Sequence, residues 1–179
     1  MQFNSAILIH PGLGNSGPTH WQSLWEREYG FPRVEQRDWE TPVRTEWTTT
    51  LNNYVSKYDP QNLILVVHSL ACITTAYWAQ QYNVKIKAAL LVAPSDTEAD
   101  TYPPGTTGFK PVPLFKLPFP SILVTSSDDY YVTVERATQF ATAWGSELIN
   151  IGKAGHINVA SGYGEWNEGL KILKRLDSK

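Results

Sequence analysis

The chain has 179 residues, a formal net charge of −2 and one cysteine, and 42% of its residues are hydrophobic. This length suits one sizeable core, so a single domain over residues 1–179 is predicted. The near-neutral charge argues against nucleic acid or an anionic membrane as partner and favours a small, weakly charged molecule. A lone cysteine excludes an intrachain disulfide, and the first residues lack the regions of a signal peptide, so a cytoplasmic location is expected.

Short apolar runs alternate with amphipathic patterns along the chain. Strands are predicted over residues 6–10, 33–37, 63–67, 86–92, 121–125 and 147–151, and helices over 19–29, 45–58, 69–82, 132–144 and 164–176. Several strands are nearly all apolar, as a parallel sheet covered on both faces requires. The alternation therefore predicts an α/β fold, a three-layer α/β/α sandwich around a mainly parallel sheet of about six strands.

One segment interrupts this alternation. Residues 95–120 contain six prolines, which exclude a long helix or a central strand. We expect an ordered loop at the strand ends, where α/β folds bind their ligands. No helical cap can be built from this segment, so we expect a shallow ligand site whose size is limited by Tyr102 and Phe109.

A candidate nucleophile lies between the apolar strand 63–67 and the helix that follows it. Ser69, in His68-Ser69-Leu70, occupies the sharp strand-to-helix turn where hydrolases expose a reactive hydroxyl. Val67 and Ala71 replace the two glycines of the usual G-x-S-x-G motif, and a simple helix N-cap is the alternative role for this serine.

Two later strands are followed by possible partners for this serine. Asp128 and Asp129 follow the strand 121–125, and His156 lies in a glycine-bracketed loop after the strand 147–151. A carboxylate that orients a histidine base, which in turn activates a serine, is the arrangement of a catalytic triad. The chain order Ser, Asp, His is that of α/β-hydrolases, although the two aspartates compete for one role.

The glycine-rich segment after the first strand has two interpretations. In a hydrolase it would supply the Leu13 N–H to an oxyanion hole, with the Leu70 N–H as the second donor. Alternatively, Gly12, Gly14 and Gly17 form a G-x-G-x-x-G pattern with Asp38 beyond it, as in dinucleotide-binding domains. That alternative leaves Ser69, the aspartates and His156 unexplained.

An ordered series of motifs resembles the small serine hydrolases of the retinoblastoma-binding-protein-9 and YdeN type, in the α/β-hydrolase superfamily. The resemblance covers nearly the whole chain and implies a lidless α/β-hydrolase core, a triad of Ser69, Asp129 and His156, and esterase-like activity. It is carried by His10-Pro11-Gly12 with His20-Trp21, Val67-His68-Ser69-Leu70 with Cys72, Val92-Ala93-Pro94, Leu117-Pro118-Phe119-Pro120, Ser127-Asp128-Asp129, Ala143-Trp144-Gly145, Gly155-His156-Ile157-Asn158 and Ser161-Gly162-Tyr163-Gly164.

We therefore expect a serine hydrolase that cleaves a small ester, thioester or amide through an acyl-enzyme. The alternatives are a hydrolase-fold protein-interaction module with vestigial activity and a dinucleotide-binding domain. No cofactor is expected, and no metal, because the histidines lack metal-ligand spacing. The predicted substrate-binding residues are Gly12, His20, His68, Tyr102 and Phe109.

Overall fold

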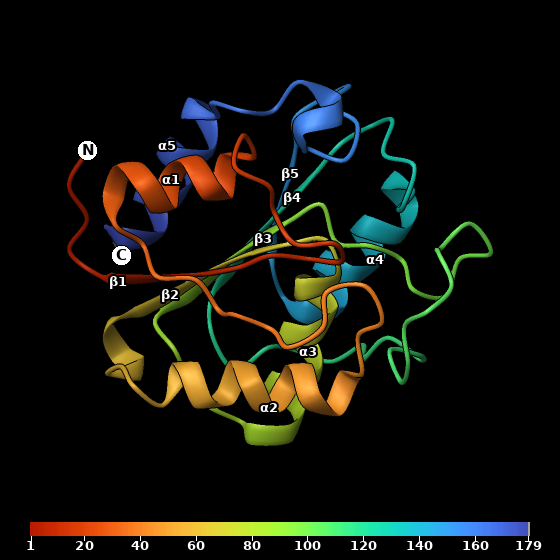
Figure 1. Cartoon of the computed structure of the whole chain (residues 1–179), viewed down its shortest axis with the longest axis horizontal. Helices are drawn as coiled ribbons and strands as arrows, with labels where there is room; N and C mark the ends of the chain where they lie inside the picture. The colour runs from red at the N-terminus through yellow and green to blue at the C-terminus, as the bar shows by residue number, and fades with distance from the viewer. Residues whose placement is uncertain (179) are drawn as a thin grey trace.

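The computed structural model describes residues 1–178, and its centre is one parallel sheet. The five strands lie side by side in chain order: β1 (Ala6–His10), β2 (Leu63–His68), β3 (Ala88–Val92), β4 (Ser121–Thr125) and β5 (Glu147–Asn150). Neighbouring strands are in register, with Ile9 opposite Val66 and Val66 opposite Leu90. The carboxyl ends of the strands therefore meet at one edge of the sheet, toward the right and upper right in Figure 1.

Helices cover both faces of the sheet and make the predicted three layers. One face carries α1 (Trp21–Tyr29) and α5 (Asn167–Asp177), and the other carries α2 (Arg44–Val55), α3 (Leu70–Tyr82) and α4 (Val134–Trp144) (Figure 1). Successive side chains of a strand point to opposite faces. In β1, Ile7 and Ile9 accordingly pack with α1 and α5, whereas Leu8 packs with the other helices. The α/β-sandwich prediction is confirmed.

The predicted strand 33–37 is reduced to a single bridge. Arg33 pairs in parallel with Ile9, and the Val34 N–H donates to the Ile9 carbonyl at 2.8 Å. The chain then leaves the sheet edge, because the Gln36 amide turns inward to donate to the Trp47 carbonyl and the Asp38 carboxylate accepts from two backbone N–H groups of the following turn. The sheet of residues 1–178 thus has five strands, against about six predicted.

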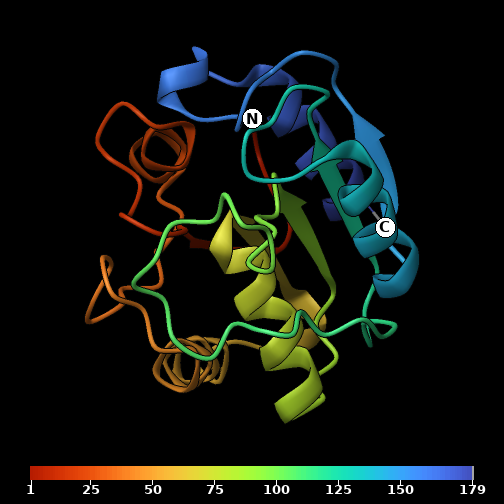
Figure 2. The ribbon, with the colours of Figure 1, turned by 90° about the vertical axis from the view of Figure 1, so that its right-hand side faces the viewer.

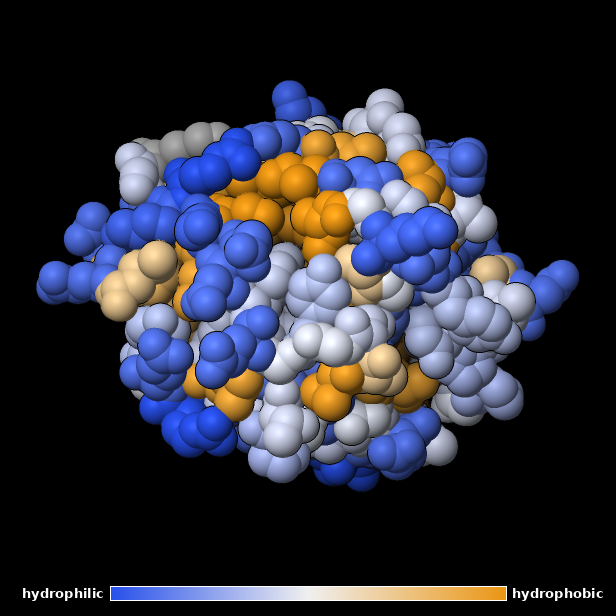
Figure 3. Space-filling view, turned by 90° about the horizontal axis from the view of Figure 1, so that it is seen from above, coloured by the Kyte–Doolittle hydropathy of each residue, from blue (hydrophilic) through white to orange (hydrophobic). Residues whose placement is uncertain are grey.

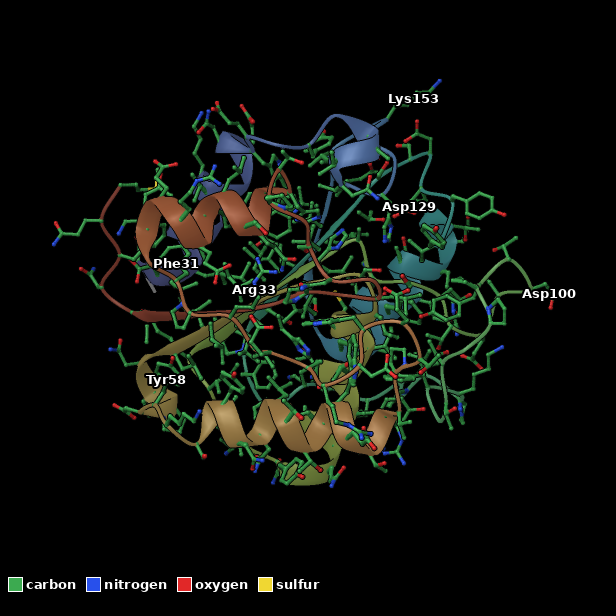
Figure 4. The ribbon with its side chains drawn as sticks, in the orientation of Figure 1. Phe31, Arg33, Tyr58, Asp100, Asp129 and Lys153 are labelled. Carbon is green, nitrogen blue, oxygen red and sulfur yellow. The ribbon has the colours of Figure 1, made fainter. Side chains whose placement is uncertain are left out.

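The segment 95–120 is an ordered loop, as its prolines predicted. It lies across the side of the molecule that faces the viewer in Figure 2, and Asp100 marks its outer tip in Figure 4. The Trp144 indole N–H donates to the Pro113 carbonyl at 2.8 Å, and the Leu117 N–H donates to the Trp144 carbonyl at 3.0 Å. These bonds attach the loop to the end of α4, and no helix is inserted between β3 and β4 in this described segment.

The face that carries α1 and α5 shows hydrophilic residues interspersed with hydrophobic groups (Figure 3). Within residues 1–178, no helix combines the length and the apolar character needed to span a bilayer.

Candidate active site

Ser69 occupies a strained turn between β2 and α3. Its backbone has φ 59° and ψ −125°, a region that serine rarely adopts, and its N–H donates to the Val92 carbonyl on β3 at 2.9 Å. Val67 and Ala71, which stand in place of the usual glycines, are both fully buried. The strand-to-helix elbow therefore forms although neither of these two positions is glycine.

The glycine that this elbow needs lies on the neighbouring strand connection. A Cβ atom on Gly12 would lie 2.7 Å from Ser69 Cβ and 2.9 Å from the His68 carbonyl oxygen. Real Cβ atoms essentially never make contacts this short. The loop after β1 can approach Ser69 only because residue 12 lacks a side chain.

Ser69, His156 and Asp129 form a continuous hydrogen-bonded chain. His156 Nε2 lies 2.9 Å from Ser69 Oγ, and His156 Nδ1 lies 2.8 Å and 3.0 Å from the two carboxylate oxygens of Asp129. The Asp129 side chain is fully buried and also accepts from the Tyr131 N–H at 2.9 Å. An ionised carboxylate accepts only, so Nδ1 carries the proton and Nε2 accepts from the serine hydroxyl.

The neighbouring aspartate holds the loop of the histidine and does not touch its ring. Asp128 Oδ1 accepts from the backbone N–H groups of Ala154 and Gly155 at 2.9 Å and 2.8 Å, and from the Ser126 hydroxyl at 2.8 Å. These bonds, led by the one from Gly155, hold the pKa of Asp128 below its usual range. The two competing aspartates thus have separate positions in the structure.

The two predicted oxyanion donors are backbone N–H groups of residues that follow Ser69 or line its pocket. Leu70 is the first residue of α3, so its N–H has no acceptor within the helix. Leu13 lies in a tight turn closed by the Asn15 N–H to the Gly12 carbonyl at 3.1 Å, and it lines the same pocket as Ser69. The guanidinium of Arg33, beneath α1 in Figure 4, donates to the Asn15 side chain at 2.7 Å and holds this turn.

A pocket of about 430 Å³ opens over Ser69 and His156. Of the predicted substrate-binding residues, His20, His68 and Tyr102 line it, whereas Gly12 is packed closely against Ser69; Leu13 also lines it. The remaining lining residues are Asn15, Gly17, Thr19, Ser95, Pro103, Tyr131, Asn158, Val159 and Ala160.

The prediction that Phe109 lines the site is wrong. Its side chain is only 1% exposed and packs in the core between α2 and α3, with ring centroids 6.1 Å from Trp47 and 6.4 Å from Tyr77. Burial of an aromatic ring in this apolar layer is more favourable than exposure at the pocket. Only Tyr102 of the two predicted loop aromatics faces the pocket.

The two pocket histidines other than His156 are held neutral in defined tautomers. His20 Nδ1 accepts from the Gln22 N–H at 3.2 Å, and burial, with the charges of Arg33 and His156, lowers its pKa to about 4. His68 Nε2 donates to the His156 carbonyl at 2.9 Å, and burial holds the pKa of His68 well below its ordinary value. Both rings are therefore weak bases and stay neutral near neutral pH.

Three contacts at the site involve residues to which the sequence analysis assigned no role. The Ser95 hydroxyl lies 2.8 Å from Ser69 Oγ, and the Tyr131 ring centroid lies 4.6 Å from that of His156. Ser161 Oγ accepts from the His156 backbone N–H at 3.0 Å. Ser95 could have been noted as the first hydroxyl after β3, at the carboxyl edge, but its contact with Ser69 depends on the turn at Ala93.

The groups that a dinucleotide site would offer are engaged elsewhere. The His20 ring caps the N-terminus of α1, and the Asp38 carboxylate accepts from the N–H groups of Glu40 and Thr41. The close approach of this loop to Ser69 explains why residue 12 is a glycine. Among residues 1–178, no group of three or more His, Cys, Asp or Glu side chains is arranged to hold a metal ion.

Comparison with known proteins places the chain among hydrolases. Residues 7–175 match the family model described as serine hydrolase. A structure described as a YdeN-like hydrolase from Pectobacterium atrosepticum has 31% identity and a TM-score of 0.85, over 97% of this chain and 90% of that one. The ydeN gene product from B. subtilis has 17% identity and a TM-score of 0.79, over 97% and 98%.

An esterase from Thermogutta terrifontis, solved with butyrate bound, has 18% identity and a TM-score of 0.66, over 97% of this chain and 82% of that one. This similarity concerns the fold. No curated protein matches the sequence at a significant level.

Proposed function

The chain belongs to the serine hydrolase family, and on that premise we propose that it cleaves small esters, thioesters or amides through an acyl-enzyme on Ser69. The observation that carries this proposal is the unbroken contact series from Asp129 through His156 to Ser69, at 2.8 Å and 2.9 Å, beneath an open pocket. Carboxylic ester hydrolysis is the reaction that we favour within this class.

In the acylation half-reaction, Ser69 Oγ attacks the carbonyl carbon while its proton passes to His156 Nε2. Asp129 stabilises the imidazolium that forms. The carbonyl oxygen becomes an oxyanion and accepts from the N–H groups of Leu13 and Leu70. When the tetrahedral intermediate collapses, the bond to the leaving group breaks and His156 returns the proton to the leaving alkoxide, thiolate or amine.

Deacylation repeats these steps with water as the nucleophile. His156 Nε2 takes a proton from water, and the resulting hydroxide adds to the acyl carbon. Collapse breaks the bond to Ser69 Oγ, and the proton on His156 returns to that oxygen. The products are the free acid and the resting enzyme.

We further propose that the acyl group is short. The pocket holds about 430 Å³ and is shared by polar groups such as Asn15, Thr19 and Asn158, so little of a long chain would be buried. Each buried methylene contributes only about 0.8 kcal/mol. Within residues 1–178, no helix is inserted between β3 and β4 to deepen the pocket.

The test is covalent labelling with a fluorophosphonate, which reacts with an activated serine. The wild-type protein should incorporate one equivalent on Ser69, located by mass spectrometry, and Ser69→Ala should incorporate none. Ser127→Ala is the matched control, because Ser127 is exposed and its hydroxyl donates to the Asn150 side chain at 3.1 Å. Labelling of another serine, or no labelling of folded wild-type protein, would overturn the assignment and favour a non-catalytic binding role.

A further inference from the structure

The nucleophile hydroxyl has a second partner that a triad does not require. Ser69 Oγ lies 2.9 Å from His156 Nε2 and 2.8 Å from Ser95 Oγ. Ser95 is only 2% exposed and lines the pocket. Two buried hydroxyl groups and one imidazole nitrogen therefore meet at the reacting oxygen.

The count of protons fixes the direction of these bonds. Asp129 keeps the imidazole proton on Nδ1, so Nε2 accepts and the single hydroxyl proton of Ser69 is donated to it. Ser69 Oγ has no second proton to give. The bond between the two serines must therefore run from the Ser95 hydroxyl to a lone pair of Ser69 Oγ.

Contacts of the residues before and after Ser95 fix the chain that carries its hydroxyl. β3 ends at Val92, and Ala93 adopts φ 47°, which is strained for a residue with a side chain. The Ala93 N–H donates to the Val124 carbonyl at 2.8 Å, and the Asp96 N–H donates to the Tyr131 carbonyl at 2.8 Å. The Asp96 carboxylate also pairs with Arg136 on α4 at 3.2 Å.

We propose that Ser95 is a catalytic residue whose hydroxyl stabilises negative charge on Ser69 Oγ as that oxygen joins and leaves the acyl carbon. This inference rests on the proposed function. In acylation, Oγ gains charge as its proton moves to His156 and before its bond to carbon is complete. In deacylation, Oγ regains charge as the bond to the acyl carbon breaks and before the proton returns from His156.

The effect depends on a difference between two states of the same hydrogen bond. A bond to an oxygen that carries charge is roughly twice as strong as a bond between neutral groups. The resting enzyme has the weaker bond and the transition state the stronger one, so only the difference accelerates the reaction. For typical hydrogen bonds in proteins this difference corresponds to about tenfold in rate.

The experiment compares Ser95→Ala, Ser95→Cys and Ser146→Ala in pre-steady-state hydrolysis of p-nitrophenyl acetate. Ser95→Ala removes the donor, whereas Ser95→Cys fills the same space with a thiol that is only a weak donor. Ser146→Ala is the matched control, because it removes one member of the serine pair Ser121–Ser146, at 2.6 Å between their hydroxyl oxygens, away from the pocket.

We expect Ser95→Ala to slow both acylation and deacylation about tenfold, with the substrate dissociation constant unchanged, and Ser95→Cys to remain nearly as slow. Ser146→Ala should retain wild-type rates. Wild-type rates in Ser95→Ala, full recovery in Ser95→Cys, or a change confined to substrate binding would overturn the role, since the last two indicate only packing or pocket shape. Failure of the proposed function is separate, because wild-type protein would then give neither a burst nor labelling of Ser69.

Discussion

Gly12 and Ser69, which are 57 positions apart in the sequence, approach so closely that a Cβ atom on the glycine would lie 2.7 Å from Cβ of the serine. The strand-to-helix elbow and the loop that carries Leu13 therefore pack as one unit.

This contact predicts a selective effect of one methyl group. Gly12→Ala must displace either the Ser69 turn or the Leu13 loop, so we expect at least a hundredfold loss of kcat/KM and a loss of about 1–3 kcal/mol in the free energy of unfolding. Gly17→Ala is the control for steric strain: it adds the same methyl group to another glycine of this loop, at the pocket wall, where a Cβ meets nothing within 4 Å. Equal activity of both variants, measured on a short p-nitrophenyl ester, would contradict the assignment of this loop to the oxyanion hole.

The two adjacent aspartates should differ sharply in their effect on turnover. Asp129→Asn removes the charge that orients and stabilises the His156 ring, which reduces kcat by about 10⁴-fold in well-studied triads. Asp128→Asn retains an oxygen that can accept from Ala154 and Gly155, so its kcat should fall by no more than about tenfold. The reverse order of these two variants would transfer the orienting role to Asp128.

Substrate length should respond to Tyr102 and not to Phe109. We expect kcat/KM to decrease from acetyl to long-chain p-nitrophenyl esters, and Tyr102→Ala to shift the preferred length upward by opening the pocket wall. Phe109→Ala should leave the chain-length profile unchanged while it lowers stability by about 3–5 kcal/mol, as for other buried aromatic rings. A steady rise toward lipid-length chains in the wild-type protein would indicate a deep tunnel in place of the shallow pocket.

Acidification should destabilise the fold before the carboxylates titrate. Burial lowers the pKa of His10 to about 3 and of His20 to about 4, and holds the pKa of His68 well below its usual value. The unfolded chain takes up these protons near pH 6.5, and the folded chain does not. The free energy of unfolding should therefore fall as the pH decreases from about 6.5 toward 4, by about 1.4 kcal/mol per pH unit for each such histidine.

Urea unfolding at several pH values between 7.5 and 5 would measure this slope. His10→Gln serves as the comparison, because an amide can contact Gln36 in place of His10 Nε2 but does not titrate. In this variant, the free energy of unfolding should depend less steeply on pH, by the amount expected for about one proton fewer taken up on unfolding, whatever its absolute stability. An unchanged slope would mean that His10 is protonated in the folded state.

The sequence predicts the layers of this fold well because β2, β3 and β4 are buried on both faces and are therefore continuous apolar runs. The segment 33–37 has strand-forming residues mixed with charges, and whether it pairs depends on where Gln36 and Asp38 find their partners. A local sequence pattern does not show which hydrogen-bond partners these side chains will find in the fold.

The site is predictable to the extent that its residues follow strand ends. Ser69 and His156 are found in this way, since each lies in the connection after a strand. Ser95 also follows a strand, but its role depends on the turn at Ala93 and on the direction of a single proton. Phe109 belongs to no motif and to no periodic apolar pattern, so its burial in the core becomes visible only in the folded structure.

Asp128 and Asp129 are joined by one peptide bond, yet one holds the backbone that precedes His156 and the other holds its ring. A shift of the loop after β4 would therefore move Asp129 and His156 together and leave the distance between their side chains nearly unchanged. The residue before Ser69 fixes this pair from the other side, because His68 Nε2 donates to the His156 carbonyl at 2.9 Å. Backbone bonds therefore link the three residues in addition to the contacts between their side chains, so a substitution that leaves all three side chains in place can still separate them.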